Sequence, residues 1–144
     1  MMLLATTAAA HAQAPKPAPA IVKIARVTGG EQTSLKPKVM TRKLGAYLGG
    51  IRRCYARTLD RAAGARGRVT FTFTVNAVGK VERSRADAFD KILTSCLMGL
   101  PPKWRFPIPT SRYAEPTTAD YKVVIDLAPP PPPPPPAPPP DDPY

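Results

Sequence analysis

Gly67-Arg68-Val69-Thr70-Phe71-Thr72-Phe73-Thr74-Val75 is the stretch that decides the fold of this chain of 144 residues. Apolar side chains alternate with threonines from position 69 to position 75, a period of two that is typical of a half-buried β-strand. Asn76-Ala77-Val78-Gly79 follows as a turn, because glycine accepts the left-handed backbone that tight turns need. Residues 81–86 return as a second strand. The centre of the chain is therefore predicted to be an antiparallel hairpin with one apolar face.

Helical patterns flank this hairpin on both sides. The first covers residues 39–59, and its glycines at positions 45, 49 and 50 predict a dependence on tertiary packing and a kink near Gly49-Gly50. The second covers residues 89–100, with Asp87 or Asp90 as its cap, and stops at Pro101-Pro102. In the first helix one face recurs at the three-four spacing of a buried surface: Leu44, Tyr47, Leu48, Ile51, Cys54, Tyr55, Thr58 and Leu59. Arg42, Arg53 and Arg57 point the opposite way.

A last strand is predicted where Tyr121, Val123, Ile125 and Leu127 alternate with other residues. The order helix, hairpin, helix, strand indicates an α+β fold with the helices on one face of an antiparallel sheet. We expect the domain to span residues 38–128, after a Pro/Ala-rich basic linker at 13–37. Residues 21–28 have enough β-branched side chains for a short strand, but Gly29-Gly30 ends it quickly.

The N-terminal residues predict export. Met1 to Ala10 is apolar and uncharged, and Ala10-His11-Ala12 or Ala12-Gln13-Ala14 supplies the small-x-small pattern of a signal cleavage site. A positively charged segment before the apolar run is missing. The run is shorter than the roughly 20 residues that span a bilayer. We therefore expect a signal peptide at residues 1–12, no integral membrane segment, and a periplasmic or secreted protein.

Residues 129–144 form a polyproline tail, with Pro129 to Pro140 interrupted only by Ala137. Such a run adopts an extended polyproline helix of roughly 3 Å per residue. It either serves as a spacer or docks into an aromatic-lined groove of a partner.

The chain is strongly basic, with 21 Lys and Arg against 10 Asp and Glu and a net charge of +11. The returning strand of the hairpin carries Lys80, Arg83 and Arg85, which predicts a basic exposed face. Basic surfaces attract nucleic acid, anionic lipid or acidic cell-wall polymer through long-range fields. An ordinary solvated surface of an arginine-rich protein is the alternative interpretation.

Cys54 and Cys96 both lie on apolar helical faces that meet the same sheet. An exported context favours a disulfide between them, which stabilises a loop of about 40 residues by roughly 4 kcal/mol. Free buried thiols are the second possibility. Redox chemistry is the third, although a catalytic pair normally has Cys-x-x-Cys spacing and a nearby base.

The residue types argue against an enzyme. His11, the only histidine, lies in the predicted signal, so a mature chain lacks an imidazole base or metal ligand. There is no phosphate-binding glycine loop, serine-centred elbow or metal-spaced cluster in the sequence. We expect no enzymatic activity, no cofactor and no metal site. Phe71 and Phe73 alternate as a core face and do not form an RNA-binding signature, so nucleic acid is not an expected partner.

Trp104-Arg105-Phe106-Pro107 places two aromatic residues around an arginine. The segment either packs Trp104 and Phe106 against the sheet while Pro107 fixes the exit of the chain, or forms an aromatic and cationic docking ledge. We favour the structural role, which we also assign to Tyr55, and expect Arg105 to be exposed.

Four segments together resemble the AgmX/PglI C-terminal domain, a family associated with gliding motility and similar to the TonB C-terminal domain. They are Ile51 to Tyr55, Gly67 to Val81, Ser95-Cys96-Leu97 and Trp104 to Pro109, and the resemblance covers about residues 39–127. It implies two helices on a three-stranded antiparallel sheet. It also implies a periplasmic binding domain without enzymatic activity, which pairs a partner peptide with an exposed sheet edge.

If these properties carry over, the last strand, Tyr121 to Leu127, is the candidate edge and Arg105 lies near it. The expected function is an adaptor of the cell envelope that binds an envelope or outer-membrane protein, or an anionic cell-wall polymer. The alternative is a structural component whose proline rod contacts or spans the peptidoglycan. The candidate partner-binding residues are Arg105, Tyr121, Lys122, Val123, Val124, Arg83 and Arg85.

Overall fold

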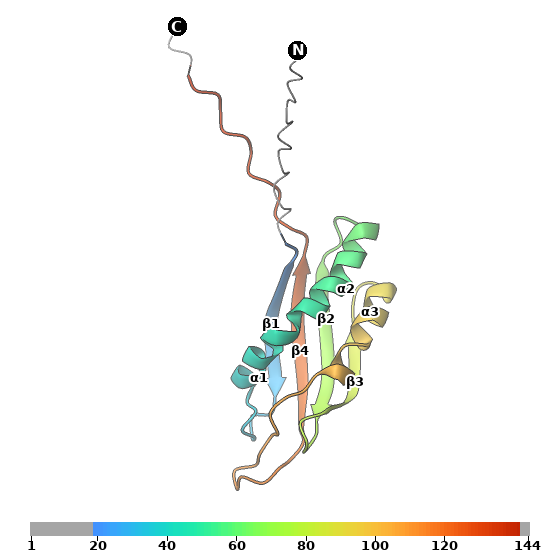
Figure 1. Ribbon diagram of the computed structural model, residues 1–144, viewed down its shortest axis with the longest axis vertical. Helices are drawn as coiled ribbons and strands as arrows, with labels where there is room; N and C mark the ends of the chain where they lie inside the picture. The colour runs from blue at the N-terminus through green and yellow to red at the C-terminus, as the bar shows by residue number, and fades with distance from the viewer. Residues whose placement is uncertain (1–18, 142–144) are drawn as a thin grey trace, which may run out of the picture.

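A computed structural model describes residues 19–141 (Figure 1). The predicted signal peptide at residues 1–12 and the first part of the predicted linker lie outside the described residues. The elements in chain order are β1 (Ile21–Gly29), α1 (Pro37–Leu44), the 3₁₀ helix η1 (Gly45–Tyr47), α2 (Leu48–Arg61), β2 (Gly67–Val75), β3 (Val81–Asp87), α3 (Lys91–Met98), the 3₁₀ helix η2 (Pro101–Lys103) and β4 (Ala119–Ala128).

The strands form one antiparallel sheet in the order β1-β4-β2-β3, and the helices lie on one of its faces (Figure 1). The predicted α+β class and the antiparallel hairpin are therefore confirmed. In β2 the apolar residues are buried, with Val69 and Phe71 fully inaccessible, while the threonines between them are half-buried. The apolar residues of the alternating pattern thus form the core face of β2, and the threonines form its open face.

The predicted number of strands is wrong, because the sheet has four and not three. The additional strand, β1, lies inside the predicted linker and pairs with β4 from Ile21↔Ala128 to Gly29↔Tyr121. Gly29 has φ +111, and a Cβ there would lie 1.9 Å from the carbonyl oxygen of Asp120. The glycines that shorten the strand pattern in sequence thus allow the chain to leave the sheet beside β4.

The last strand forms where it was predicted, but its assignment as an edge of the sheet is wrong. Tyr121 to Leu127 lies within β4, which has β1 on one side and β2 on the other. Since both neighbours occupy its backbone groups, β4 is an inner strand and offers no edge. Sequence alternation reports which face of a strand is buried, but it carries no information about the strand's neighbours.

The first predicted helix is a run of three parts. It is interrupted at η1, before the expected kink at Gly49-Gly50, while the backbone of Leu44, Gly45 and Leu48 keeps right-handed helical angles. Consequently α1, η1 and α2 follow one another diagonally across the sheet (Figure 1). Residues 37–61 span about 38 Å at the helical rise of 1.5 Å per residue.

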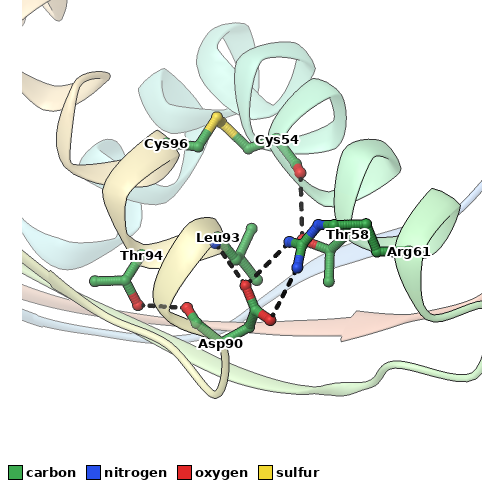
Figure 2. Close-up of polar contacts among 7 residues, drawn as sticks. All are labelled: Cys54, Thr58, Arg61, Asp90, Leu93, Thr94 and Cys96. Carbon is green, nitrogen blue, oxygen red and sulfur yellow. Dashed lines mark hydrogen bonds and ion pairs between the residues drawn. A yellow bond between two sulfur atoms is a disulfide. The ribbon is translucent and has the colours of Figure 1, made fainter.

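A disulfide joins Cys54 of α2 to Cys96 of α3, with 5.7 Å between their Cα atoms (Figure 2). It is accompanied by a polar contact between the same helices. Asp90 caps α3, since the Leu93 N–H donates to its Oδ1 at 2.8 Å, and Arg61 of α2 donates to that carboxylate at 3.1 Å. These two links hold α3 beside α2.

The polyproline tail leaves the sheet from the end of β4. Its residues from 131 to 141 are exposed and contain no regular element. Because Ile21 is paired with Ala128, β1 begins where β4 ends. The chain therefore enters β1 and leaves β4 at the same end of the sheet.

Candidate functional site

The two edges of the sheet are β1 and β3, and β3 is obstructed. The β2–β3 register shifts between Thr72 and Thr74, and Arg83, in the bulge opposite, has φ 50, a left-handed conformation that is rare for a residue with a Cβ. The segment after η2 covers the start of this edge: the Phe106 N–H donates to the Gly79 carbonyl at 3.0 Å. Bulges and charged side chains are the usual means by which proteins protect an edge.

The opposite edge, β1, is longer and less obstructed. It has nine residues, and within residues 19–141 no strand pairs with its outer side. Ile21 is 44% exposed, and Ile24 and Val27 are partly buried beside the core. The register with β4 shifts between Ile24 and Arg26. β1 thus presents a row of backbone donors and acceptors next to apolar side chains, to which an extended peptide can be added.

The predicted binding residues of the last strand lie on different faces of the sheet. Tyr121 and Val123 are buried in the core, at 3% and 1% exposure. Lys122 and Val124 lie on the open face, because their neighbours along the strand point inward. These four residues therefore do not form one surface. Arg83 and Arg85 are exposed on β3, across the sheet from the free edge.

Arg105 lies beside the start of β3 and not beside a free edge, since it forms a bridge with Lys80. Its backbone N–H donates to the Tyr47 hydroxyl at 2.9 Å, and that hydroxyl donates to the Arg105 carbonyl at 2.8 Å. The guanidinium donates to the carbonyls of Pro102 and Trp104. The residue is exposed, as expected, but its side chain is turned back onto its own segment.

An aromatic cluster connects this segment to the sheet. Trp104 and Phe106 are 3% and 7% exposed. Trp104 is stacked on Tyr47 with 5.4 Å between centroids, and Phe106 is stacked on Phe73 at 5.9 Å. Such pairs add to the apolar area that each ring buries. The segment from 104 to 106 thus connects η1 to β2, while Pro107 is exposed.

Two tyrosines couple the core to loop backbones. The Tyr121 hydroxyl donates to the Leu35 carbonyl, and the Tyr55 hydroxyl donates to the Ala65 carbonyl. Burial raises the pKa of both phenols above the ordinary value, because it disfavours the ionised form. Both residues act as structural ties in the described part of the chain.

The helix-free face of the sheet is polar, and two of its arginines are paired with acidic residues. Arg68 donates to Asp126 across two strands at 2.8 Å, and Arg85 lies 3.6 Å from Asp87. A shallow hollow of about 340 Å³ on this face contains an acidic residue, Asp120, among its basic and hydroxyl groups. The Thr74 hydroxyl donates to that carboxylate at 2.5 Å.

The helix face carries a long series of cations with almost no acidic residues among them. Residues 36–61 contain one acidic residue, Asp60, and eight basic residues, all exposed: Lys36, Lys38, Arg42, Lys43, Arg52, Arg53, Arg57 and Arg61. Of these, Arg61 is paired with Asp90. From the sequence, the basic surface was expected on the hairpin, although Arg42, Arg53 and Arg57 lie opposite the apolar helical face. The pattern that indicates the helix face is the recurrence of basic residues along residues 36–61, where only one acidic residue occurs.

Comparisons with protein-family models, with curated proteins and with solved structures find no match for this chain. None of the helices in the described part has the length and apolar character needed to cross a membrane. Residues 19–141 contain no group of three or more side chains of the kinds that hold metal ions.

Proposed function

We propose that this chain is an exported, non-enzymatic interaction module of the cell envelope that binds an extended segment of a partner protein along β1. The observation that carries the proposal is the asymmetry of the two sheet edges. Both edge strands contain a bulge, but the start of β3 is also covered by the bridge between Lys80 and Arg105, whereas the outer side of β1 has no partner within residues 19–141. Main-chain pairing to such an edge supplies affinity, and side-chain contacts supply specificity.

The disulfide supports the export part of the proposal. Disulfides persist in oxidising compartments such as the periplasm and are rare in the cytosol. Cys54 is 3% exposed, and the bond links α2 to α3, so it acts as a structural staple. Mass spectrometry of the protein isolated without reductant is expected to show the mass of the oxidised form. Alkylation of both thiols in that preparation would contradict export into an oxidising compartment.

The edge proposal is tested with peptides selected from a random nonapeptide library on the folded domain. We expect hydrogen exchange of the complex to slow at the β1 amides and to remain unchanged at β3. Ala25→Asp, at the exposed bulge residue of β1, is expected to weaken binding, because Asp disfavours strand pairing. Ser84→Asp makes the same change on β3 and is the matched control. Protection at β3, or an equal loss in both variants, would rule out β1 as the binding edge.

The alternative function assigns the contact to the polyproline tail. Residues 129–140 would extend about 37 Å as a polyproline helix. Deleting residues 129–144 leaves β1 untouched, so the edge proposal expects the selected peptides and envelope partners to be retained. Loss of all envelope partners on deletion would favour the structural rod.

A further inference from the structure

The second surface that remains after the β1 edge is the outer side of the helix layer, which we define as the exposed residues of the run from Lys36 to Arg61 together with Lys103 of η2. Its charge is not neutralised by its neighbours. Within residues 19–141 the ion pairs involve only Arg61, Arg68 and Arg85 among the cations. The remaining seven cations of the helical run therefore face solvent without an acidic partner.

This arrangement works against the stability of the helix. Arg53, Arg57 and Arg61 follow one another at a spacing of four residues, as do Lys38 and Arg42. Like charges at this spacing repel each other and destabilise a helix. A surface that only needed solubility would be served by mixed signs. The repulsion is relieved when an anion binds along the run.

A hollow of about 180 Å³ lies within this surface, between α2 and η2. It is lined by Ala46, Tyr47, Gly50, Arg53, Leu100, Lys103 and Trp104. Two cations and no carboxylate line it, in contrast to the hollow on the sheet face, which includes Asp120. The hollow therefore has the charge required to hold an anionic group.

The middle of the helical run also lacks side chains on its outer side. A Cβ on Gly45 would meet nothing within 4 Å, and one on Gly49 would meet only the end of Arg53 at 3.9 Å. Glycine is less favourable than alanine in a helix, and no packing contact requires either of these two glycines. Because these glycines have no side chains, the backbone of a bound polymer can approach the helix closely between the neighbouring cations.

We infer that the helix face binds a linear polymer of phosphate groups, which runs along α1 and α2 and places one phosphate in the hollow at Arg53 and Lys103. Several features favour this ligand over others. The cations are distributed over about 38 Å of helix, which matches an extended chain better than a single ion. Five of the eight are arginines, whose planar guanidinium matches phosphate geometry. No large hydrophobic side chain of α1 or α2 is exposed, which argues against insertion into a lipid surface.

The inference deepens the proposed function, because it names an anionic envelope polymer as a second ligand, bound on a face other than the β1 edge. The probe is long-chain inorganic polyphosphate, titrated into the mature full chain at several salt concentrations. Counterion release predicts that log K falls linearly with log salt, with a slope of about −0.7 per phosphate contact for a flexible single chain. Polyglutamate of equal charge is expected to bind at least several-fold more weakly, since carboxylates do not match the size and charge of phosphate.

The variant that tests the location is the triple substitution Arg53→Gln, Arg57→Gln and Lys103→Gln. It is expected to lower the affinity for polyphosphate roughly tenfold or more at low salt and to flatten the salt slope by about two. The matched control neutralises three exposed cations of β1 and the sheet face: Lys23→Gln, Arg26→Gln and Lys122→Gln. Both proteins have the same net charge. The control is expected to change the affinity no more than two- to threefold.

These measurements test polyphosphate binding to the helix face and do not depend on the β1 edge. Equal losses in the two triple variants would overturn it, because net charge alone would then explain binding. Tighter binding to polyglutamate, or to vesicles with anionic phospholipid, would also overturn it. A thymidine oligonucleotide with the same number of phosphates distinguishes the two sources of phosphate. If the protein contacts only the phosphates, the oligonucleotide and polyphosphate are expected to bind with equal affinity. A much higher affinity for the oligonucleotide would identify the ligand as a nucleic acid. Selected nonapeptides are expected to bind the helix-face triple variant normally, so failure here leaves the β1 edge testable.

Discussion

On the helix-free side of the sheet, basic and acidic side chains stand beside each other, whereas on the helix side cations stand beside cations. Arg68 meets Asp126 and Arg85 meets Asp87, while Arg53, Arg57 and Arg61 share one helical spacing. Antiparallel register brings residues of different strands together, so opposite charges can be matched across the sheet. The contrast teaches that the net charge of this chain is not spread evenly over its surface.

The two layers also differ in how they are held. The sheet is a continuous ladder from β1 to β3, while the helices are tied by one disulfide and the Asp90 contacts (Figure 2). The helix layer is therefore expected to respond more strongly to local changes.

Replacing both cysteines, Cys54→Ala and Cys96→Ala, should lower the free energy of unfolding by about 4 kcal/mol, because the sequence separation is 42. The measurement is urea unfolding, with reduced wild type as the control for loss of side-chain volume. Hydrogen exchange should accelerate more in α2 and α3 than in β2 and β4. A uniform acceleration across both layers would contradict the difference between them.

Tyr121→Phe tests the tie between the sheet and the loop before α1. Removing the hydroxyl leaves the Leu35 carbonyl without this donor, at an expected cost of about 1–3 kcal/mol. Tyr113→Phe is the control, since Tyr113 is 70% exposed and little change is expected there. Chemical denaturation of the two variants beside wild type gives the comparison, and equal stabilities would show that the buried hydroxyl is dispensable.

The same tyrosine predicts an alkaline limit. Because burial raises the pKa of Tyr121 in the folded state, its contribution is fully present below the unfolded value of about 10 and is lost as pH rises through the folded value. Stability of the wild type should therefore decline above about pH 10, and more steeply than that of Tyr121→Phe. If the stabilities of the wild type and of Tyr121→Phe declined in parallel at alkaline pH, the decline could not be assigned to Tyr121.

Gly49→Ala should stabilise the helix layer by up to about 1 kcal/mol, since alanine favours the helix and its Cβ would meet only Arg53 at 3.9 Å. Gly50→Ala is a matched control one residue away. A Cβ at that position would lie 3.3 Å from Leu100, so a smaller gain or a loss is expected. Thermal unfolding of the two variants separates the exposed glycine from the packed one.

Asp90→Asn tests the polar link between α2 and α3. Hydrogen bonds from Arg61, and secondarily from the Leu93 N–H, hold the pKa of Asp90 below its usual value. A lowered folded pKa contributes stability above the unfolded pKa of about 3.9, which is lost as pH falls through the folded value. The variant should be less stable at neutral pH and should show a shallower acid limb. Asp60→Asn, on the exposed side of α2, is the charge-matched control and should keep the wild-type limb.

Several elements of the fold were predictable because their signals are local. The alternation from Val69 to Val75 defines the core face of β2 by itself. The second helix forms in the expected region, but α3 ends at Met98 with Gly99 as its C-cap, and Pro101-Pro102 begin η2. Of the two suggested caps, Asp90 is the one that accepts from Leu93. Residues 21–28 were recognised as having the composition of a short strand, but they were assigned to the linker, because β1 gains its stability by pairing with β4, about 100 residues later in the chain. A short strand next to glycines gives no local indication of so distant a partner.

For the candidate surfaces, too, local features were predictable and the arrangement of distant elements was not. Arg83, Arg85 and Arg105 were correctly expected to be exposed, since charged side chains are costly to bury. Their grouping with Tyr121 to Val124 was wrong, because it assumed that the last strand was an edge. The free edge at β1 and the hollow between α2 and η2 depend on which elements are neighbours, and neither could be inferred from composition or spacing.

Local patterns were enough to predict the α+β class, the buried faces of β2 and β4, the helical positions of the cysteines and the basic charge, because periodicity and residue chemistry act over a few neighbouring positions. The tertiary structure alone decided the strand order β1-β4-β2-β3, the obstruction of the β3 edge and the concentration of cations on the helix side. Those features arise from contacts between residues far apart in the chain, where the free energy of pairing and packing depends on every element at once.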